Sequence, residues 1–346
     1  MTTMWGIHND HFGHELVDEG FVSIGSEGVG DVSKIGNDSA RLRAAVATAY
    51  PAAKPGAIPV WAGVLRRFAF EVREGDRVLA PRRSDSTLNF GVVDGPYEYH
   101  SDVSAHPHRR RVRWLQTGVS RSRFPQSALY EIGCLVTLFQ VKRSLEVFDA
   151  FLAAPTASVL LIEPPTANGD ATRSETRADL LPDEPNAERI DQHTRDFVTR
   201  VLLTRLSPYE FEHFVAALLK AMGYEARVTQ RSVDGGIDVI AHHDPLGLEP
   251  PIIKVQCKQT SAPVGRPVVQ QLVGALAHNE LGLFVTLGSY SREAFDEERQ
   301  RQSLRLLAGP DIADLTLRHY ADLAPEWRAR MPLRSVLVVD HDPELS

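Results

Sequence analysis

The sequence predicts two domains of different classes: an N-terminal α+β domain around a small β-barrel and a C-terminal α/β domain with a mixed sheet. Short strand-like runs, broken by Gly and Pro, fill most of the chain before residue 163. After residue 204, helix and strand patterns alternate, as they do in α/β domains. The length of 346 residues also favours two domains over one. We place the first domain at 1–150, an acidic linker at 163–195 and the second domain at 196–346.

The composition is that of an ordinary globular protein, with 43% hydrophobic and 24% charged residues. The sequence has no apolar run of about 18 residues and no signal-like start, so we expect a soluble cytoplasmic protein without a membrane partner. The net charge of −7 excludes a uniformly basic coat. It hides a split, because residues 65–125 carry twelve arginines against seven acids, whereas 163–195 carries eight acids against four arginines.

The strands expected in the N-terminal domain come from alternating residues. The runs "GDRVLAP" (75–81) and "LNFGVV" (88–93) read as paired strands, with a turn at "VDGPY" (93–97) and a further strand at "RVRW" (111–114). Together they predict a small twisted barrel with flanking helices. The segment that follows at 163–195 is rich in Pro and acids and lacks apolar periodicity, which indicates an exposed linker.

The C-terminal domain begins with a helix that has clear boundaries. Ser207 is the expected N-cap, Pro208 stands at the first helical position, and Glu210 completes a capping box. Apolar residues then recur at the helical period until Gly223. The elements predicted after it are strands at 225–230, 236–242 and 252–259, a helix at 265–278, a strand at 281–288 and a helix at 291–303.

The strand "KVQCKQ" (254–259) presents an unusual polar face. Side chains alternate along a strand, so Lys254, Gln256 and Lys258 share one side. A buried charge without a partner costs several kcal/mol, so this face requires solvent, protein or a ligand opposite it. Asp238, at the start of the strand expected to pair with it, can supply a carboxylate. Glu212 on the first helix can supply a second one, since it has no role in the capping box.

These side chains make a set suited to phosphodiester hydrolysis. Hard oxygen ligands such as those of Asp238, Gln256 and Glu212 bind Mg²⁺, and we expect them to be the metal ligands. A bound metal ion polarises a phosphate oxygen and activates water, while Lys258 can offset the charge that develops. A single QxK or DGGID motif would mean little, whereas four such groups in this order of elements are informative.

The stretches "FEHFVAALLKAMGY", "DGGIDVIA", "VQCKQ" and "VGRPVVQQLVGAL" together resemble Mrr-family restriction endonucleases, a branch of the PD-(D/E)xK nucleases. The resemblance covers about residues 204–335. It implies that Asp238 is the metal-binding aspartate, that Gln256 fills the (D/E) position, that Lys258 is the catalytic lysine and that Glu212 is the helix acid. Mg²⁺ is the implied cofactor, with Mn²⁺ as a substitute. Most of the superfamily has a carboxylate at the Gln256 position, although glutamine is usual in the Mrr branch.

The N-terminal part, roughly 1–145, is similar to PUA-like and EVE-like domains. The resemblance implies a nucleic-acid reader, in some cases one that takes a modified base into an aromatic pocket. A flipped base needs aromatic faces to replace its lost stacking, although any single aromatic can instead belong to the barrel core. The candidate pocket residues are Trp5, Trp61, Tyr97, Tyr99 and Trp114. The candidate DNA contacts are Arg82, Arg83, Arg109, Arg110, Arg111, Gln270 and Gln271.

From these features we expect a Mg²⁺-dependent DNA endonuclease that restricts foreign or phage DNA bearing modified bases. Double-stranded DNA is the expected partner. A homodimer or higher homo-oligomer is also expected, because a domain with one site must cut two strands. Two alternatives stay open: a DNA repair or junction-resolving nuclease, and a non-catalytic DNA-binding protein with a degenerate nuclease fold.

Overall fold

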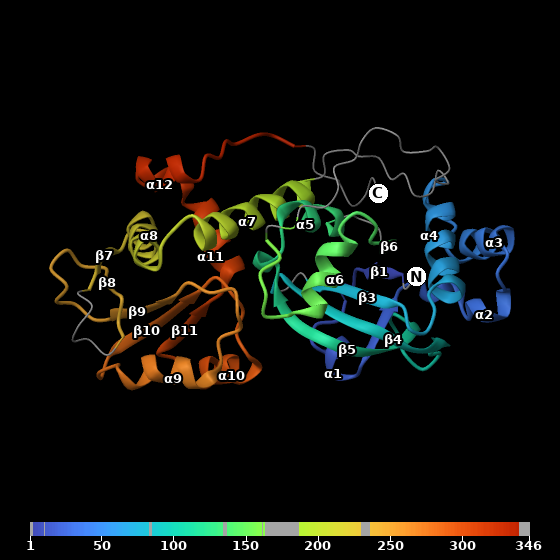
Figure 1. The fold of residues 1–346 in the computed structure, drawn as a ribbon, viewed down its shortest axis with the longest axis horizontal. Coiled ribbons are helices and arrows are strands. Elements are labelled where there is room, and N and C mark those ends of the chain that lie inside the picture. Colours follow the sequence, from blue (N-terminus) through green and yellow to red (C-terminus); the bar gives the residue numbers. More distant parts are fainter. Residues whose placement is uncertain are drawn as a thin grey trace. The chain divides into compact units, whose positions relative to one another are not determined.

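The computed structural model describes residues 3–9, 11–82, 85–133, 137–160, 162, 187–229 and 236–338. The chain forms two compact units. One holds most of the chain before residue 160, and the other consists of Val119–Gln126 and Ile190–Leu337. Figure 1 labels most of the helices and strands of both units.

The first unit is built on a six-stranded mixed sheet with the order β2-β5-β4-β3-β1-β6. β1 runs parallel to β3, whereas β1 with β6, β2 with β5 and β3 with β4 are antiparallel. The described pairings leave β2 and β6 at the two edges, so the predicted PUA- or EVE-like barrel is not confirmed. The strands are β1 Met4–Ile7, β2 Phe21–Ile24, β3 Arg77–Arg82, β4 Thr87–Tyr99, β5 His108–Ser120 and β6 Leu138–Gln140.

Helices cover both faces of this sheet. Apolar side chains of α3 and α4 pack in one cluster with Val78 and Ala80 of β3. Phe90 pairs with Leu79 and therefore faces the other way. There it contacts Phe151 of α6, with ring centroids 5.2 Å apart. The helices are α1 Glu15–Asp18, α2 Val32–Ile35, α3 Ser39–Ala49, α4 Ala57–Arg66, α5 Gln126–Ile132 and α6 Leu145–Ala153, with helical turns η1 Glu27–Val29, η2 Arg67–Glu71 and η3 Arg121–Arg123.

The predicted turn at "VDGPY" (93–97) is wrong, because β4 continues through it as far as Tyr99. A strand tolerates a proline such as Pro96 where its position requires no N–H donor. The carbonyl oxygen of Gly95 accepts a hydrogen bond from the side chain of Arg110. The reversal comes later, between Tyr99 and His108, where β4 ends and β5 begins.

The second part of the predicted linker is also wrong, because residues 187–195 belong to helix α7 (Ala187–Thr204). The apolar pattern of this helix starts only near Val198, so its first turns look like linker in the sequence. Polar pairs hold those turns, among them Arg195 with Asp191 at 2.5 Å. The rest of the predicted linker, 163–186, lies outside the described residues.

The second unit contains a five-stranded sheet with the order β11-β10-β9-β8-β7. β9, β10 and β11 are parallel, whereas β8 is antiparallel to β7 and β9, so the predicted mixed sheet is confirmed. The strands are β7 Glu225–Val228, β8 Val239–His242, β9 Ile252–Lys258, β10 Glu280–Thr286 and β11 Leu304–Leu307. The helices are α8 Pro208–Ala221, α9 Arg266–Gly274, α10 Arg292–Gln300, α11 Gly309–Arg318 and α12 Pro325–Arg330, with the turn η4 Tyr320–Asp322.

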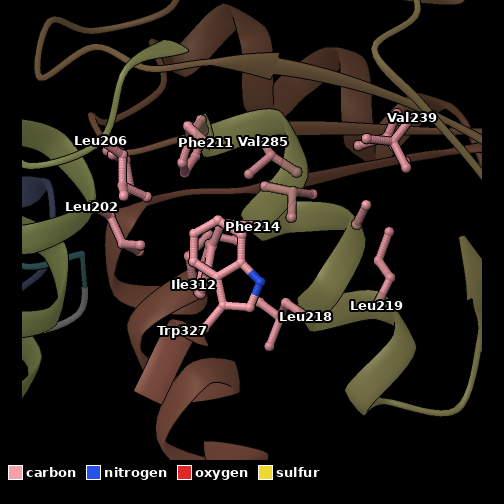
Figure 2. Packing of buried hydrophobic residues seen from close by; sticks show 14 of the residues in the cluster. Leu202, Leu206, Phe211, Phe214, Leu218, Leu219, Val239, Val285, Ile312 and Trp327 are labelled. Atoms are coloured by element: carbon pink, nitrogen blue, oxygen red, sulfur yellow. The ribbon is translucent and has the colours of Figure 1, made fainter. Parts of the chain in front are cut away.

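The sheet of the second unit lies between two layers of helices. α9 and α10 cover one face, and α7, α8 and α11 lie on the other (Figure 1). On the latter face the ring of Phe214 meets Trp327 edge to face at 5.4 Å (Figure 2). Val255 and Val285 of the central strands are fully buried. Polar side chains on β9 therefore need defined partners.

None of the helices in the described part of the chain has both the length and the apolar character needed to span a membrane.

Candidate active site

Lys254, at the start of the polar face of β9, has a protein partner. Its Nζ lies 2.7 Å from Oε2 of Glu280 and donates to the carbonyl oxygen of Ala275 at 3.2 Å. Burial opposes the ionisation of Glu280, but the hydrogen bond from Lys254 leaves the pKa of that carboxyl below its usual range. Lys254 is thus an internal ion-pair partner.

Asp238 stands directly before β8 and is anchored to the middle of β9. Its backbone N–H donates to the carbonyl oxygen of Val255 at 2.8 Å. Its Oδ2 accepts the backbone N–H of Cys257 at 2.7 Å. The carboxylate therefore takes the place of a backbone carbonyl where the ladder between β8 and β9 ends. It lies beside the backbone that joins Gln256 to Lys258.

The side-chain oxygen of Gln256 is a candidate ligand for a cation or water. Its Oε1 is buried and has no hydrogen-bond partner among the described residues. A buried acceptor left in this way costs about 1–3 kcal/mol unless water or a cation satisfies it. Gly236 leaves room for this side chain, since a Cβ there would lie 3.3 Å from Nε2 of Gln256.

Glu212 lies in the middle of α8, with 8% of its surface exposed. α8 covers the face of the sheet that carries Val255 and Cys257, whereas alternation along β9 places Gln256 and Lys258 on the other face. Burial raises the pKa of the Cys257 thiol, and the carboxylates of Asp238 and Glu212 raise it further. The place of Glu212 in the site stays a prediction. Glu210, in contrast, forms the predicted capping box with Ser207.

Lys258 is the last residue of β9, and its side chain is exposed. Alternation along the strand puts it on the same side as Gln256. Within the described residues it forms no ion pair, unlike Lys254 on the same strand. Its ammonium group is therefore available to a bound ligand.

The side-chain oxygens of Asp238, Gln256 and Glu212 are of the type that a hard divalent cation prefers. Within the described residues, no group of three or more His, Cys, Asp and Glu side chains is placed to hold a metal ion. The expected ligands, two carboxylates of Asp238 and Glu212 and the amide oxygen of Gln256, are a mixed set, and their role stays a prediction. Mg²⁺ suits such a set, since it commonly takes one or two carboxylates and keeps several waters.

The two glutamines of α9 have different surroundings. Gln270 donates to Oε2 of Glu297 at 3.1 Å, and Arg266 binds the same oxygen at 2.8 Å. Gln271 is exposed on the neighbouring position. Both side chains are exposed, and Gln270 differs in being bound to Glu297, so a DNA contact stays a prediction for both.

Two of the arginines predicted to contact DNA are buried, so this prediction is wrong for them. Arg110 is 4% exposed and donates to the carbonyl oxygens of Phe68, Ala69 and Gly95. Burial lowers its pKa to about 10. Arg82 is 9% exposed and binds Asp85. Both guanidinium groups are occupied inside the unit and cannot reach a phosphate.

The other predicted arginines differ from these two. The guanidinium carbon of Arg109 lies 4.2 Å from the ring centroid of Phe21, and its side chain is mostly covered. Arg111 is 72% exposed, with Glu98 at 3.5 Å. Arg83 lies outside the described residues. Arg111 is the best placed of the described candidates for a phosphate contact.

The aromatic residues predicted to form a base pocket mostly belong to the core. Trp5 is 2% exposed and donates to Asp76 at 3.0 Å, so its assignment to a pocket is corrected. Tyr97 and Trp114 are half-buried and pack against the same cluster. The hydroxyl group of Tyr97 is 2.7 Å from Nδ1 of His108, and burial raises the pKa of this tyrosine.

Two further aromatic candidates are more accessible. Tyr99 is half-buried, with its ring centroid 5.4 Å from that of His108. Trp61 is 39% exposed and meets Tyr50 edge to face. Their role in base recognition stays a prediction.

In comparison with known proteins, two parts of the chain match two different family models. Residues 203–316 match the restriction endonuclease family Mrr_cat, and residues 3–132 match a domain of unknown function, DUF8426. The type IV methyl-directed restriction enzyme EcoKMrr of Escherichia coli (strain K12) is 32% identical over 161 residues, 43% of this chain and 51% of that relative. The chain thus spans about half the length of this curated relative.

Solved structures of restriction enzymes are also similar. The MspJI restriction endonuclease in complex with a 27-mer oligonucleotide is 15% identical, with 98% of this chain and 82% of that chain covered and a TM-score of 0.33. The DNA modification-dependent restriction endonuclease AspBHI is 16% identical, with coverages of 79% and 70% and a TM-score of 0.33. On the family match, residues 203–316 of this chain are similar to the catalytic domain of Mrr-type restriction endonucleases.

Proposed function

We propose that this protein is a metal-dependent DNA endonuclease that hydrolyses phosphodiester bonds. The observation that supports the proposal is the hydrogen bond from the N–H of Cys257 to Asp238, which holds this carboxylate beside the backbone between Gln256 and Lys258, together with the buried oxygen of Gln256 that has no partner among the described residues. All four lie within the residues that match the restriction endonuclease family. A backbone phosphate of the DNA would then contact the metal held by these oxygen ligands and the exposed ammonium group of Lys258.

The proposed roles follow from the chemistry of each side chain. Asp238, Glu212 and Gln256 would hold Mg²⁺, which supplies Lewis-acid polarisation of the phosphate and a more acidic bound water. Lys258 donates hydrogen bonds to the phosphate or to the attacking water and offsets the negative charge that develops in the transition state. The hydrogen bond from Cys257 keeps the carboxylate of Asp238 oriented toward the strand end.

We further propose that the N-terminal unit selects DNA with modified bases, so that the chain restricts foreign or phage DNA. The support is the relative described as methyl-directed and the presence of a separate folded unit before the nuclease domain. The described residues contain one such candidate site, and a duplex has two strands, so two copies acting together are the proposed cleaving species.

Cleavage of matched plasmids tests the proposal. The full chain is incubated with methylated and unmethylated plasmid, with Mg²⁺ or with a chelator, and compared with Asp238→Asn and Lys258→Met. We expect cleavage of methylated DNA that requires the metal and falls by about 100-fold or more in both variants. Lys254→Met is the matched control, because it removes a lysine from the same face of the same strand.

Other results would contradict the proposed residues or favour one of the alternative functions. Cleavage near the wild-type rate in Asp238→Asn or Lys258→Met removes those residues from the mechanism. Equal rates on all plasmids favour a repair or junction-resolving nuclease. Metal-independent binding without any cleavage favours a non-catalytic DNA-binding protein.

A further inference from the structure

We infer that Thr286 and Gln259 are positioning residues that fix the backbone of Lys258 and so determine where its ammonium group acts. The inference rests on the proposed nuclease function. The sequence analysis gives neither residue a role, although Gln259 ends the stretch "KVQCKQ". Both hold the chain at the position where β9 ends and the candidate lysine projects.

Thr286 is a buried polar residue at the end of β10, after the apolar run Leu281–Val285. It is the residue of β10 paired with Lys258, and it is fully buried. Its hydroxyl group donates to the carbonyl oxygen of Lys258 at 2.9 Å and accepts the N–H of Gly288 at 3.3 Å. Buried parallel strands are ordinarily rich in Val, Ile and Leu, so a hydroxyl group here needs a specific reason. The carbonyl of Lys258 supplies it.

Gln259, the residue after Lys258, is bound to a different part of the chain. Its Nε2 donates to the carbonyl oxygens of Leu202 and Leu206, each at 2.7 Å. The first of these belongs to the last turn of α7, where helix carbonyls lack intrahelical partners. One amide group therefore uses both of its protons to join the end of α7 to the residue after Lys258.

A close backbone approach holds the loop that follows. A Cβ at Gly288 would lie 2.4 Å from the carbonyl oxygen of Ala262, so only glycine lets the two segments pass at this distance. The N–H of Val264 then donates to the carbonyl oxygen of Ser289 at 2.8 Å. The chain is therefore fixed from Lys258 to Val264 by β10 and the residues after it.

This anchoring matters because the side chain of Lys258 has no protein partner of its own in the described residues. Lys254 is oriented by Glu280 at its tip, whereas Lys258 is oriented only by its backbone. A four-carbon stem amplifies any shift of the Cα atom. A displacement of about 1 Å in a catalytic group can lower a rate by about 100-fold.

The test uses the full chain and pairs of conservative variants. Thr286→Val removes the hydroxyl group at nearly constant volume, Thr286→Ser keeps it, and Gln259→Met removes both donors at similar length. We expect Thr286→Val and Gln259→Met to lower the single-turnover rate on duplex DNA by about tenfold or more. DNA affinity should stay within about twofold, and Thr286→Ser should cut almost as wild type. Gln300→Met, at an exposed glutamine of α10, is the matched control.

The outcomes separate the inference from the proposed function. A wild-type chain that cuts no duplex with Mg²⁺ or Mn²⁺ overturns both. If wild type cuts, wild-type rates in Thr286→Val and Gln259→Met overturn the inference alone. The same holds if Thr286→Ser loses as much rate as Thr286→Val, or if the loss of rate only follows the loss of folded protein, measured from the melting temperature.

Discussion

Arg110 and Arg111 are neighbours on β5, and their side chains point to opposite faces of the strand. The guanidinium of Arg110 binds three backbone carbonyls inside the first unit, whereas that of Arg111 is largely in solvent. The same residue type therefore serves folding at one position and is available for nucleic acid at the next. A count of arginines in the sequence cannot separate these two roles.

The pair gives a prediction with an internal control. Arg110→Met should lower the free energy of unfolding by about 3 kcal/mol, because it leaves buried carbonyl groups without donors. Arg111→Ala should leave stability almost unchanged but reduce the slope of log K against log salt by about 1, as expected for one lost phosphate contact. Urea unfolding and DNA binding at several salt concentrations measure the two effects. The opposite pattern would contradict the assignment of both arginines.

Gln256 contributes a neutral oxygen where a carboxylate would bind a cation more strongly. Gln256→Glu adds one negative charge, so we expect the Mg²⁺ concentration that gives half-maximal binding to fall severalfold. Isothermal titration calorimetry of Mg²⁺ with the full chain measures this directly, without reliance on cleavage. Gln256→Leu removes the oxygen and should abolish the binding. Unchanged Mg²⁺ affinity in both variants would exclude Gln256 from the metal site.

At the scale of the element, the start of α8 is held by a carboxylate with several donors. The N–H of Ser207 donates to Oε2 of Glu210 at 2.8 Å, and Arg330 donates to Oε1 at 2.8 Å. The backbone hydrogen bond from Ser207, followed by the bond from Arg330, lowers the pKa of Glu210 to about 2. Glu210 is therefore more readily ionised in the folded protein than in the unfolded chain. Its hydrogen bonds link the start of α8 to the end of α12.

This lowered pKa predicts how the cap depends on pH. The usual pKa is 4.5, so the stabilisation by Glu210 is complete above that pH and is lost as the pH falls toward 2. Glu210→Gln should therefore lower the melting temperature at pH 7, and the difference from wild type should shrink between pH 4.5 and pH 2. Thermal unfolding across this range measures it. A difference that is constant with pH would show that the charge of Glu210 is not involved.

The elements also show what the sequence can and cannot reveal. The capping box at Ser207 and the strand around Gln256 are local signals, because a cap or an alternating face depends on residues a few positions apart. The first turns of α7 carry no apolar stripe. They are stabilised by polar pairs, including that of Arg195 with Asp314, which is distant in sequence. Thr286 and Gln259 were missed for a similar reason, since their partners are carbonyl groups that carry no sequence signal.

At the scale of the whole molecule, the compact units are not continuous stretches of the sequence. Val119–Gln126 belongs to the second unit, although it follows directly from β5 residues of the first. Within the second unit Arg121 binds Asp196 of α7, at 2.7 Å from Nη2 to Oδ2, and both side chains are almost fully buried. Gln192 donates to the same carboxylate at 3.0 Å. The predicted domain starting at residue 196 therefore lacks a segment that this unit contains.

The buried pair predicts a large effect of a single substitution. Arg121→Ala leaves the carboxylate of Asp196 buried without its cation, so the free energy of unfolding of the second unit should fall by about 3–5 kcal/mol. Arg195→Ala on the same helix removes only partly exposed ion pairs and should cost less than about 1 kcal/mol. Urea unfolding followed by Trp327 fluorescence and hydrogen exchange in α7 would measure both. Similar effects of the two substitutions would contradict a buried role for Arg121.

The crossing of Val119–Gln126 into the second unit also limits how genes for such proteins can recombine. A single crossover in the codons for residues 163–186 would join a foreign N-terminal part to this nuclease domain. The second unit of the hybrid would then contain a foreign segment in place of Val119–Gln126, which includes Arg121. Exchange of the N-terminal part between relatives therefore requires either a second crossover that keeps residues 119–126 with the C-terminal part, or a donor that already has an arginine able to bind Asp196.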